Sequence, residues 1–406
     1  MDLIFQTSKI YKKGNKIRIK VSPKVWKYIL ESYPEEIEKI KKSPDFKNFS
    51  KWVRGEEDPT IKQVKKLAKK LYIPLRYFYL PDIPKEKLPV PFYRKGRKWE
   101  GKISVELRET IKDLQEKQIF LSEYLQYINK KPLEFVGILN IDKDPVKCAQ
   151  KIREILNLDI DWNLKQNSKS HAFNFLKDKL ESIGIFVFTG SYLYLNTKRP
   201  YNSEEFKGFS LVDKYAPIIF INTNDFLSAQ IFTLTHELVH IFVGEGDIFS
   251  DGEELDISAE KVEVFSNKVS AEILVPGDIF ENKWKQVRDF IKLGEEFKVS
   301  PLAIAIRAKE FKKITQNEYE SFKNEYLKNI EKILSKEKAS KSEGANFYLT
   351  FSKKMSKRFV EILLNAVTND FITYRDAYNY LGIRGKTFDE FIKFLWGEMK
   401  FDKISP

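Results

Sequence analysis

The chain has 406 residues, of which 42% are hydrophobic and 32% charged, so it predicts two to four folded domains and excludes a largely disordered protein. No apolar stretch approaches about 18 residues and the first residues do not resemble a signal peptide, so we expect a cytoplasmic protein without a membrane partner. The net charge of +13 is concentrated in residues 1–100, with 26 Lys and Arg against 12 Asp and Glu, and we expect a polyanion to bind there.

Residues 1–82 predict a basic helical domain. Basic and apolar side chains alternate from Lys16 to Lys20, which predicts an arm or a short strand, and Ser22 followed by Pro23 is typical of a helix start. Three further helices are expected over residues 35–40, 45–53 and 59–71. Several short helices with basic side chains on several faces are typical of a helix-turn-helix domain.

Three segments, Trp52–Thr60, Leu67–Leu71 and Ile73–Pro81, resemble the Xre-type helix-turn-helix. The resemblance implies that the helix at about residues 45–53 enters the major groove of double-stranded DNA. The DNA contacts that it implies are Lys47, Asn48, Lys51 and Arg54. The alternative is a helical domain that serves packing or protein contact.

Residues 83–101 are rich in proline and predict an extended linker. The next domain is expected at residues 102–335, where apolar side chains recur first at helical spacing and then at strand spacing. The predicted helices are 104–129, 144–156 and 172–183, and the predicted strands are 185–188, 206–212 and 216–222. We expect the following apolar helix to be capped by Thr223 or Asn224 and to end at Gly244.

That apolar helix, Ile231–Val243, contains the sequence His-Glu-x-x-His. Because an α-helix has 3.6 residues per turn, His236 and His240 lie one above the other and can bind the same zinc ion. Glu237 lies on a neighbouring face, where it can act on metal-bound water without being a ligand. This arrangement is typical of a metallopeptidase.

A catalytic zinc ion needs three protein ligands and one open position. Cys148 is the only cysteine, and we expect a structural or surface role for the third histidine, His171. The third ligand must therefore be a carboxylate from the helix at about residues 259–273. Its candidates are Glu260, Glu263 and Glu272.

Several segments resemble the ImmA/IrrE family of zinc metallopeptidases, namely Gly208–Val212, Ala216–Asn222, Phe232–His240 and Leu274–Pro276. The family segment in which Glu is the ligand and Asn follows four residues later implies Glu263 as the ligand, with Asn267 supporting a ligating histidine. The resemblance also implies Zn²⁺ as the cofactor and a transcriptional repressor or antitoxin-like transcription factor as the substrate.

The hypothesis is therefore a regulatory zinc endopeptidase, in which His236, His240 and Glu263 hold Zn²⁺ and Glu237 takes a proton from metal-bound water. The predicted fold class is α+β and mostly helical. It comprises a helix-turn-helix-like N-terminal domain, a zincin-like peptidase domain with a small sheet and the HExxH helix, and a small helical C-terminal domain at residues 346–406. A linker at 336–345 separates the last two. We expect the C-terminal helices to serve packing or partner binding, and the alternative is a second helix-turn-helix.

Substrate is expected to bind along the strand at 206–212, and the candidates for stabilising the oxyanion are Tyr201, Lys214 and Tyr215. The rival hypothesis is a DNA-binding regulator or toxin–antitoxin component whose metal site is sensory or structural. A zinc ion without an open coordination position would support that rival.

Overall fold

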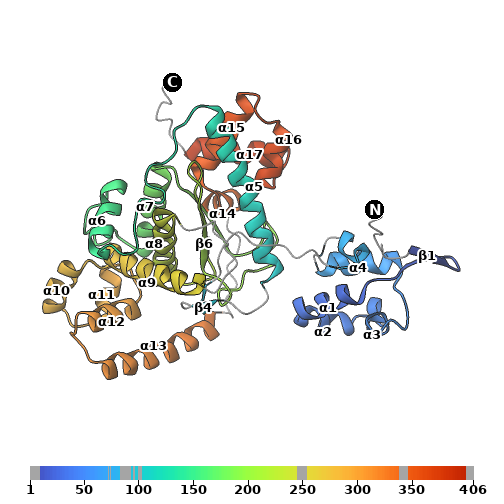
Figure 1. Ribbon diagram of the computed structural model, residues 1–406, viewed down its shortest axis with the longest axis horizontal. Coiled ribbons are helices and arrows are strands. Elements are labelled where there is room, and N and C mark those ends of the chain that lie inside the picture. Colours follow the sequence, from blue (N-terminus) through green and yellow to red (C-terminus); the bar gives the residue numbers. More distant parts are fainter. Residues whose placement is uncertain are drawn as a thin grey trace. The chain divides into compact units, whose positions relative to one another are not determined.

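The computed structural model describes residues 10–71, 73, 75–82, 93–94, 97–98, 103–244, 254–337 and 346–398 (Figure 1). The chain divides into an N-terminal unit, Met1–Lys87, and a C-terminal unit, Leu88–Pro406. The described residues are mostly helical with small sheets, as the predicted α+β class requires. None of their helices combines the length and the apolar content needed to cross a membrane.

The N-terminal unit consists of a β-hairpin and short helices. Strands β1 (Ile10–Lys13) and β2 (Lys16–Ile19) pair antiparallel. Ser22 caps the first helix by accepting a hydrogen bond from the amide of Lys24, as predicted. The helices are α1 (Pro23–Ser32), α2 (Pro34–Lys41), α3 (Phe49–Val53) and α4 (Ile61–Leu71), with 3₁₀ turns at Pro44–Phe46 and Leu75–Tyr79.

The helix predicted over residues 45–53 is divided into a 3₁₀ turn and the short helix α3. Phe46, Phe49 and Trp52 are all buried and follow one another at intervals of three residues. Three residues complete a turn of a 3₁₀-helix, whereas three residues of an α-helix fall about 60° short of one. The break therefore lets all three rings enter one core, where Trp52 makes edge-to-face contacts with the two phenylalanines.

The C-terminal unit is built around a three-stranded sheet with the order β5–β7–β6. The strands are β5 (Phe186–Gly190), β6 (Gly208–Leu211) and β7 (Ile218–Asn222), close to the predicted ranges. Strand β7 pairs parallel with β5 and antiparallel with β6. Because side chains alternate along a strand, the sheet presents two apolar faces, and both are covered.

One face of the sheet, represented by Val187 and Ile219, packs into a core with the predicted HExxH helix, now α8 (Leu227–Val243). This core also contains residues of four helices that follow α8 in the chain and two that precede the sheet (Figure 1). These helices are α6 (Pro145–Leu156), α7 (Lys169–Ser182), α9 (Glu254–Leu274), α10 (Gly277–Gln286), α11 (Phe290–Glu296) and α12 (Pro301–Glu310), and α13 (Gln316–Glu337) packs on α12.

The other face, represented by Phe188 and Phe220, packs into a second core with the long helix α5 and the C-terminal helices. Ser104 caps α5 and begins it at the predicted position. The helices of this layer are α5 (Val105–Tyr127), α14 (Phe347–Lys354), α15 (Lys357–Thr368), α16 (Tyr374–Leu381) and α17 (Lys386–Glu398). The C-terminal helices thus share a core with the sheet (Figure 1).

The predicted linkers fall mainly outside the described residues. Within 83–101 only the short paired strands β3 (Tyr93–Arg94) and β4 (Arg97–Lys98) are described, and within 336–345 only the end of α13. Residues 245–253, between α8 and α9, also lie outside them.

Candidate metal centre

Helix α8 spans Leu227–Val243 and is followed by Gly244 as its C-cap, but its start is not capped as predicted. Phe226 is the N-cap residue and makes no side-chain hydrogen bond to the helix. Asn224 instead donates hydrogen bonds to the backbone oxygens of Ser191 and Tyr201, at 2.7 and 2.8 Å. The prediction of a Thr223 or Asn224 cap was therefore wrong, because Asn224 holds neighbouring loops instead.

Gly244 ends the helix in the left-handed conformation, with φ of +83°, as predicted. A Cβ atom at this position would lie 2.7 Å from the Cα of Gly137. Both the dihedral angle and the close approach therefore require glycine at the end of the HExxH helix.

Three side chains from α8 and α9 converge on one point. The Nε2 atoms of His236 and His240 are 3.0 Å apart, and they lie 3.3 and 3.2 Å from the two carboxylate oxygens of Glu263. A tetrahedral zinc ion with bonds of about 2.0–2.1 Å separates its nitrogen and oxygen ligands by about 3.3–3.4 Å. The spacing of these donor atoms is therefore compatible with a single zinc ion.

The charge state of Glu263 is that of a metal ligand. Burial pushes the pKa of its carboxyl group upward, but hydrogen bonds with His236 and His240 and their charge outweigh that effect and hold the pKa at about 2. Glu263 is therefore a carboxylate at neutral pH, the form that binds a metal.

The other two candidate ligands lie elsewhere. The buried carboxylate of Glu272 accepts a hydrogen bond from the amide of Gly277 at 3.0 Å and forms an ion pair with Arg307. Glu260 is exposed and lines an open hollow together with Lys261 and Lys268. The structure thus brings Glu263, and neither of the other two, beside the histidines.

Glu237 lies next to this cluster and contacts strand β6. The hydroxyl of Ser210 donates a hydrogen bond to its Oε2 atom at 2.8 Å. Ser210 is buried, and it follows Phe209 and precedes Leu211, which both point into the opposite core. A role for this serine was not predicted from the sequence. The alternation of a polar residue with apolar ones on a strand could have indicated that it faces the other side of the sheet.

Gly208 explains how β6 comes so close to α8. A Cβ atom there would lie 2.7 Å from both the backbone oxygen of Phe220 and the methyl group of Thr233. The strand beside the candidate site is thus packed directly on the helix that carries Glu237.

The remaining predicted residues lie apart from this cluster. Asn267 is exposed on α9, and the buried Nδ1 atom of His236 has no hydrogen-bond partner among the residues that the structure describes. His171 is exposed. Of the residues considered for the oxyanion, Lys214 is exposed, and Tyr201 and Tyr215 pack into the core on the face of the sheet opposite to α8.

The four residues considered for DNA contact lie around α3. Lys47, Lys51 and Arg54 are exposed, and Arg54 forms an ion pair with Glu56 at 2.6 Å. Asn48 donates a hydrogen bond to Glu57 at 2.8 Å, and the same glutamate pairs with Arg18. Two of the four side chains are therefore already engaged by neighbouring carboxylates.

Comparison with known families finds two matches. Residues 182–309, less than a third of the chain, match a peptidase family model described as the IrrE N-terminal-like domain. Residues 355–394, in the C-terminal helices, match a domain of unknown function, DUF8813. No curated protein and no solved structure gave a significant match. The first match supports the resemblance to the ImmA/IrrE family and a metallopeptidase-type activity for the segment with the sheet, α8 and α9.

Proposed function

We propose that the C-terminal unit is a zinc-dependent endopeptidase of regulatory type, with His236, His240 and Glu263 as the zinc ligands. The observation that carries the proposal is the approach of their donor atoms to 3.0–3.3 Å, the spacing of ligands around one tetrahedral ion. Zinc, when bound, supplies a Lewis acid that polarises a peptide carbonyl and acidifies water.

Glu237 is the proposed general base and acid. Its carboxylate accepts a proton from the attacking water and returns it to the leaving amine. The hydrogen bond from Ser210 holds one carboxylate oxygen in place, which leaves the other free for this proton. Ser210 is thus a positioning residue for the reaction.

The peptide substrate is proposed to bind along β6. Within the described residues β6 pairs with β7 on one side only, so its other edge can accept an extended peptide as a further strand. Ser210 lies on this strand and contacts Glu237, so a peptide at that edge would be held beside the candidate metal centre.

The substrate class is proposed to be a transcriptional repressor or antitoxin-like transcription factor, and the N-terminal unit is proposed to bind double-stranded DNA. Support for DNA binding comes from the excess positive charge of residues 1–100. The same charge also favours a second candidate function, a DNA-binding regulator or toxin–antitoxin component whose metal site is sensory or structural.

The test compares the full-length wild type with Glu237→Gln, using zinc-loaded protein and purified candidate repressors. We expect Glu237→Gln to bind one equivalent of zinc and to cleave about 10²–10⁴-fold more slowly, because the general base is lost. Glu260→Gln, an exposed position on α9, is the matched control and should cleave like the wild type. Undiminished cleavage by Glu237→Gln would refute the proposed mechanism, and zinc binding without any cleavage by the wild type would favour the second candidate.

A further inference from the structure

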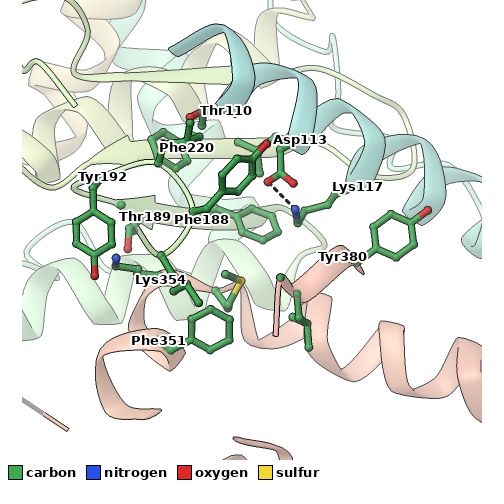
Figure 2. Close-up of a pocket in the computed structure, with 18 of the residues that line it drawn as sticks. Thr110, Asp113, Lys117, Phe188, Thr189, Tyr192, Phe220, Phe351, Lys354 and Tyr380 are labelled. Carbon is green, nitrogen blue, oxygen red and sulfur yellow. Dashed lines mark ion pairs between the residues drawn. The ribbon is translucent and has the colours of Figure 1, made fainter. Parts of the chain in front are cut away.

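A cavity of about 430 Å³ lies on the face of the sheet opposite to α8 (Figure 2). Its walls come from α5, from β5 and the loop after it, and from α14 and α16. The volume falls in the range of about 300–1,000 Å³ that is usual for small-molecule sites. Strands β5 and β7, which contribute Phe188 and Phe220 to the cavity, separate it from the candidate metal centre.

Aromatic rings form much of the lining. Phe188 and Phe220 come from the sheet, Phe351 from α14, Tyr380 from α16 and Tyr192 from the loop after β5 (Figure 2). Such walls favour a ligand with a flat apolar body, because stacked and edge-on ring contacts add to the area that the ligand buries.

The lining carries two carboxylates, Asp113 and Glu116, and two lysines, Lys117 and Lys354, but only one ion pair forms among these four groups in the described residues. Lys117 is buried and forms an ion pair with Asp113 at 2.5 Å. The Nζ atom of Lys354 is also buried, yet it has no hydrogen-bond partner in the part of the chain that the structure describes. It lies 3.2 Å from the centroid of the Tyr192 ring, and burial lowers the pKa of this lysine more than the contact with Tyr192 raises it. A buried ammonium group without a counterion is costly, and a cation–π contact offsets only part of that cost.

Hydrogen bonds fix the backbone on both sides of Lys354. The backbone oxygen of Lys353 accepts hydrogen bonds from Thr189 on β5 at 3.1 Å and from Lys177 on α7 at 3.2 Å. Lys177 also donates to the backbone oxygen of Met355 at 2.9 Å. Both residues that flank Lys354 are therefore fixed to the rest of the unit.

We propose that this cavity binds a small molecule with a flat aromatic body and one anionic oxygen group, which pairs with Lys354. Tyr192 is only partly buried and lies in a loop, so its ring can turn away and let the anion take its place on the ammonium group. The aromatic body then contacts the rings of the sheet and of α16. The proposal is independent of the candidate metal centre and of the peptidase function.

The test uses the full-length protein with phenylacetate, phenyl phosphate and the neutral analogue phenylacetamide, titrated by calorimetry and by ligand-observed NMR. We expect saturable binding of at least one anion, at least about tenfold tighter than that of phenylacetamide, because only the anion compensates the buried charge. The tighter of the two anions identifies a carboxylate or a phosphate as the natural group.

Lys354→Met should weaken binding of that anion at least about tenfold and remove its preference over phenylacetamide. Lys353→Met, an exposed neighbour on the same helix, is the matched control and should bind like the wild type. The proposal would be overturned if the wild type bound the anions and the amide equally well, or if neither anion gave saturable binding below about 10 mM. Unchanged anion binding by Lys354→Met would also overturn it. The comparison of charged and neutral probes on the wild type tests the preference for an anion even if the variant does not fold.

Discussion

Replacing Ser210 by alanine removes the hydrogen bond that holds Glu237, and it is the sharpest test of how the candidate site is organised. The bond is 2.8 Å long, its donor is buried and its acceptor is a carboxylate. Hydrogen bonds to charged groups contribute about 1.5–3 kcal/mol. If that energy is realised only when Glu237 is correctly placed in the transition state, kcat/KM falls by about 10- to 150-fold in Ser210→Ala.

The assay measures zinc content and peptide cleavage side by side. Zinc content should not change, because the hydroxyl of Ser210 hydrogen-bonds Glu237, which is not one of the three proposed ligands. Ser270→Ala is the matched control, since Ser270 is a buried serine on α9 whose hydroxyl has no hydrogen-bond partner among the described residues. Its cleavage rate should stay within about threefold of the wild type. A Ser210→Ala enzyme as fast as this control, or one that has lost its zinc, would refute the positioning role.

Three further outcomes follow from the structure. Glu263→Gln should weaken zinc binding at least about 100-fold by calorimetry, and Glu260→Gln should not, because only the first faces the histidines; equal losses would contradict the ligand assignment. Gly244→Ala should lower the free energy of unfolding of the zinc-free protein by about 2–4 kcal/mol, measured by urea titration. Gly382→Ala, at a left-handed helix end with open space around it, should lower it by only about 1 kcal/mol. Similar losses in the two variants would show that the close approach of Gly244 to Gly137 has no energetic effect. Lys51→Ala in the full chain should reduce the salt dependence of duplex DNA binding by about one charge, and an unchanged slope would exclude that contact.

Several elements were predictable because their signals are local. The caps at Ser22 and Ser104 and the end of α8 at Gly244 depend on residues within one turn of the helix end. The strands of the small sheet were recognisable from their runs of β-branched and aromatic residues between turns. The helix over residues 45–53 was predicted too long, because local spacing does not reveal how three rings share a core.

The candidate metal site also combines local features with features that depend on packing. The spacing of four residues between His236 and His240 places both on one face of a helix, whatever the rest of the chain does. The approach of Glu263 from α9 depends on the packing of that helix against α8, and the residue spacing by itself left three glutamates open. The bond from Ser210 joins residues 27 positions apart, so it exists only once β6 lies against α8.

The sequence was thus sufficient to predict many of the helices, the three strands of the small sheet, the histidine pair and the basic N-terminal region, since each follows from neighbouring residues or from composition. Only the tertiary structure decided which glutamate joins the histidines, which residue orients Glu237, and that the C-terminal helices cover the second face of the sheet and enclose a cavity there. The physical reason is that these features are contacts between segments far apart in the chain, and their geometry is set by how whole helices and strands pack against each other.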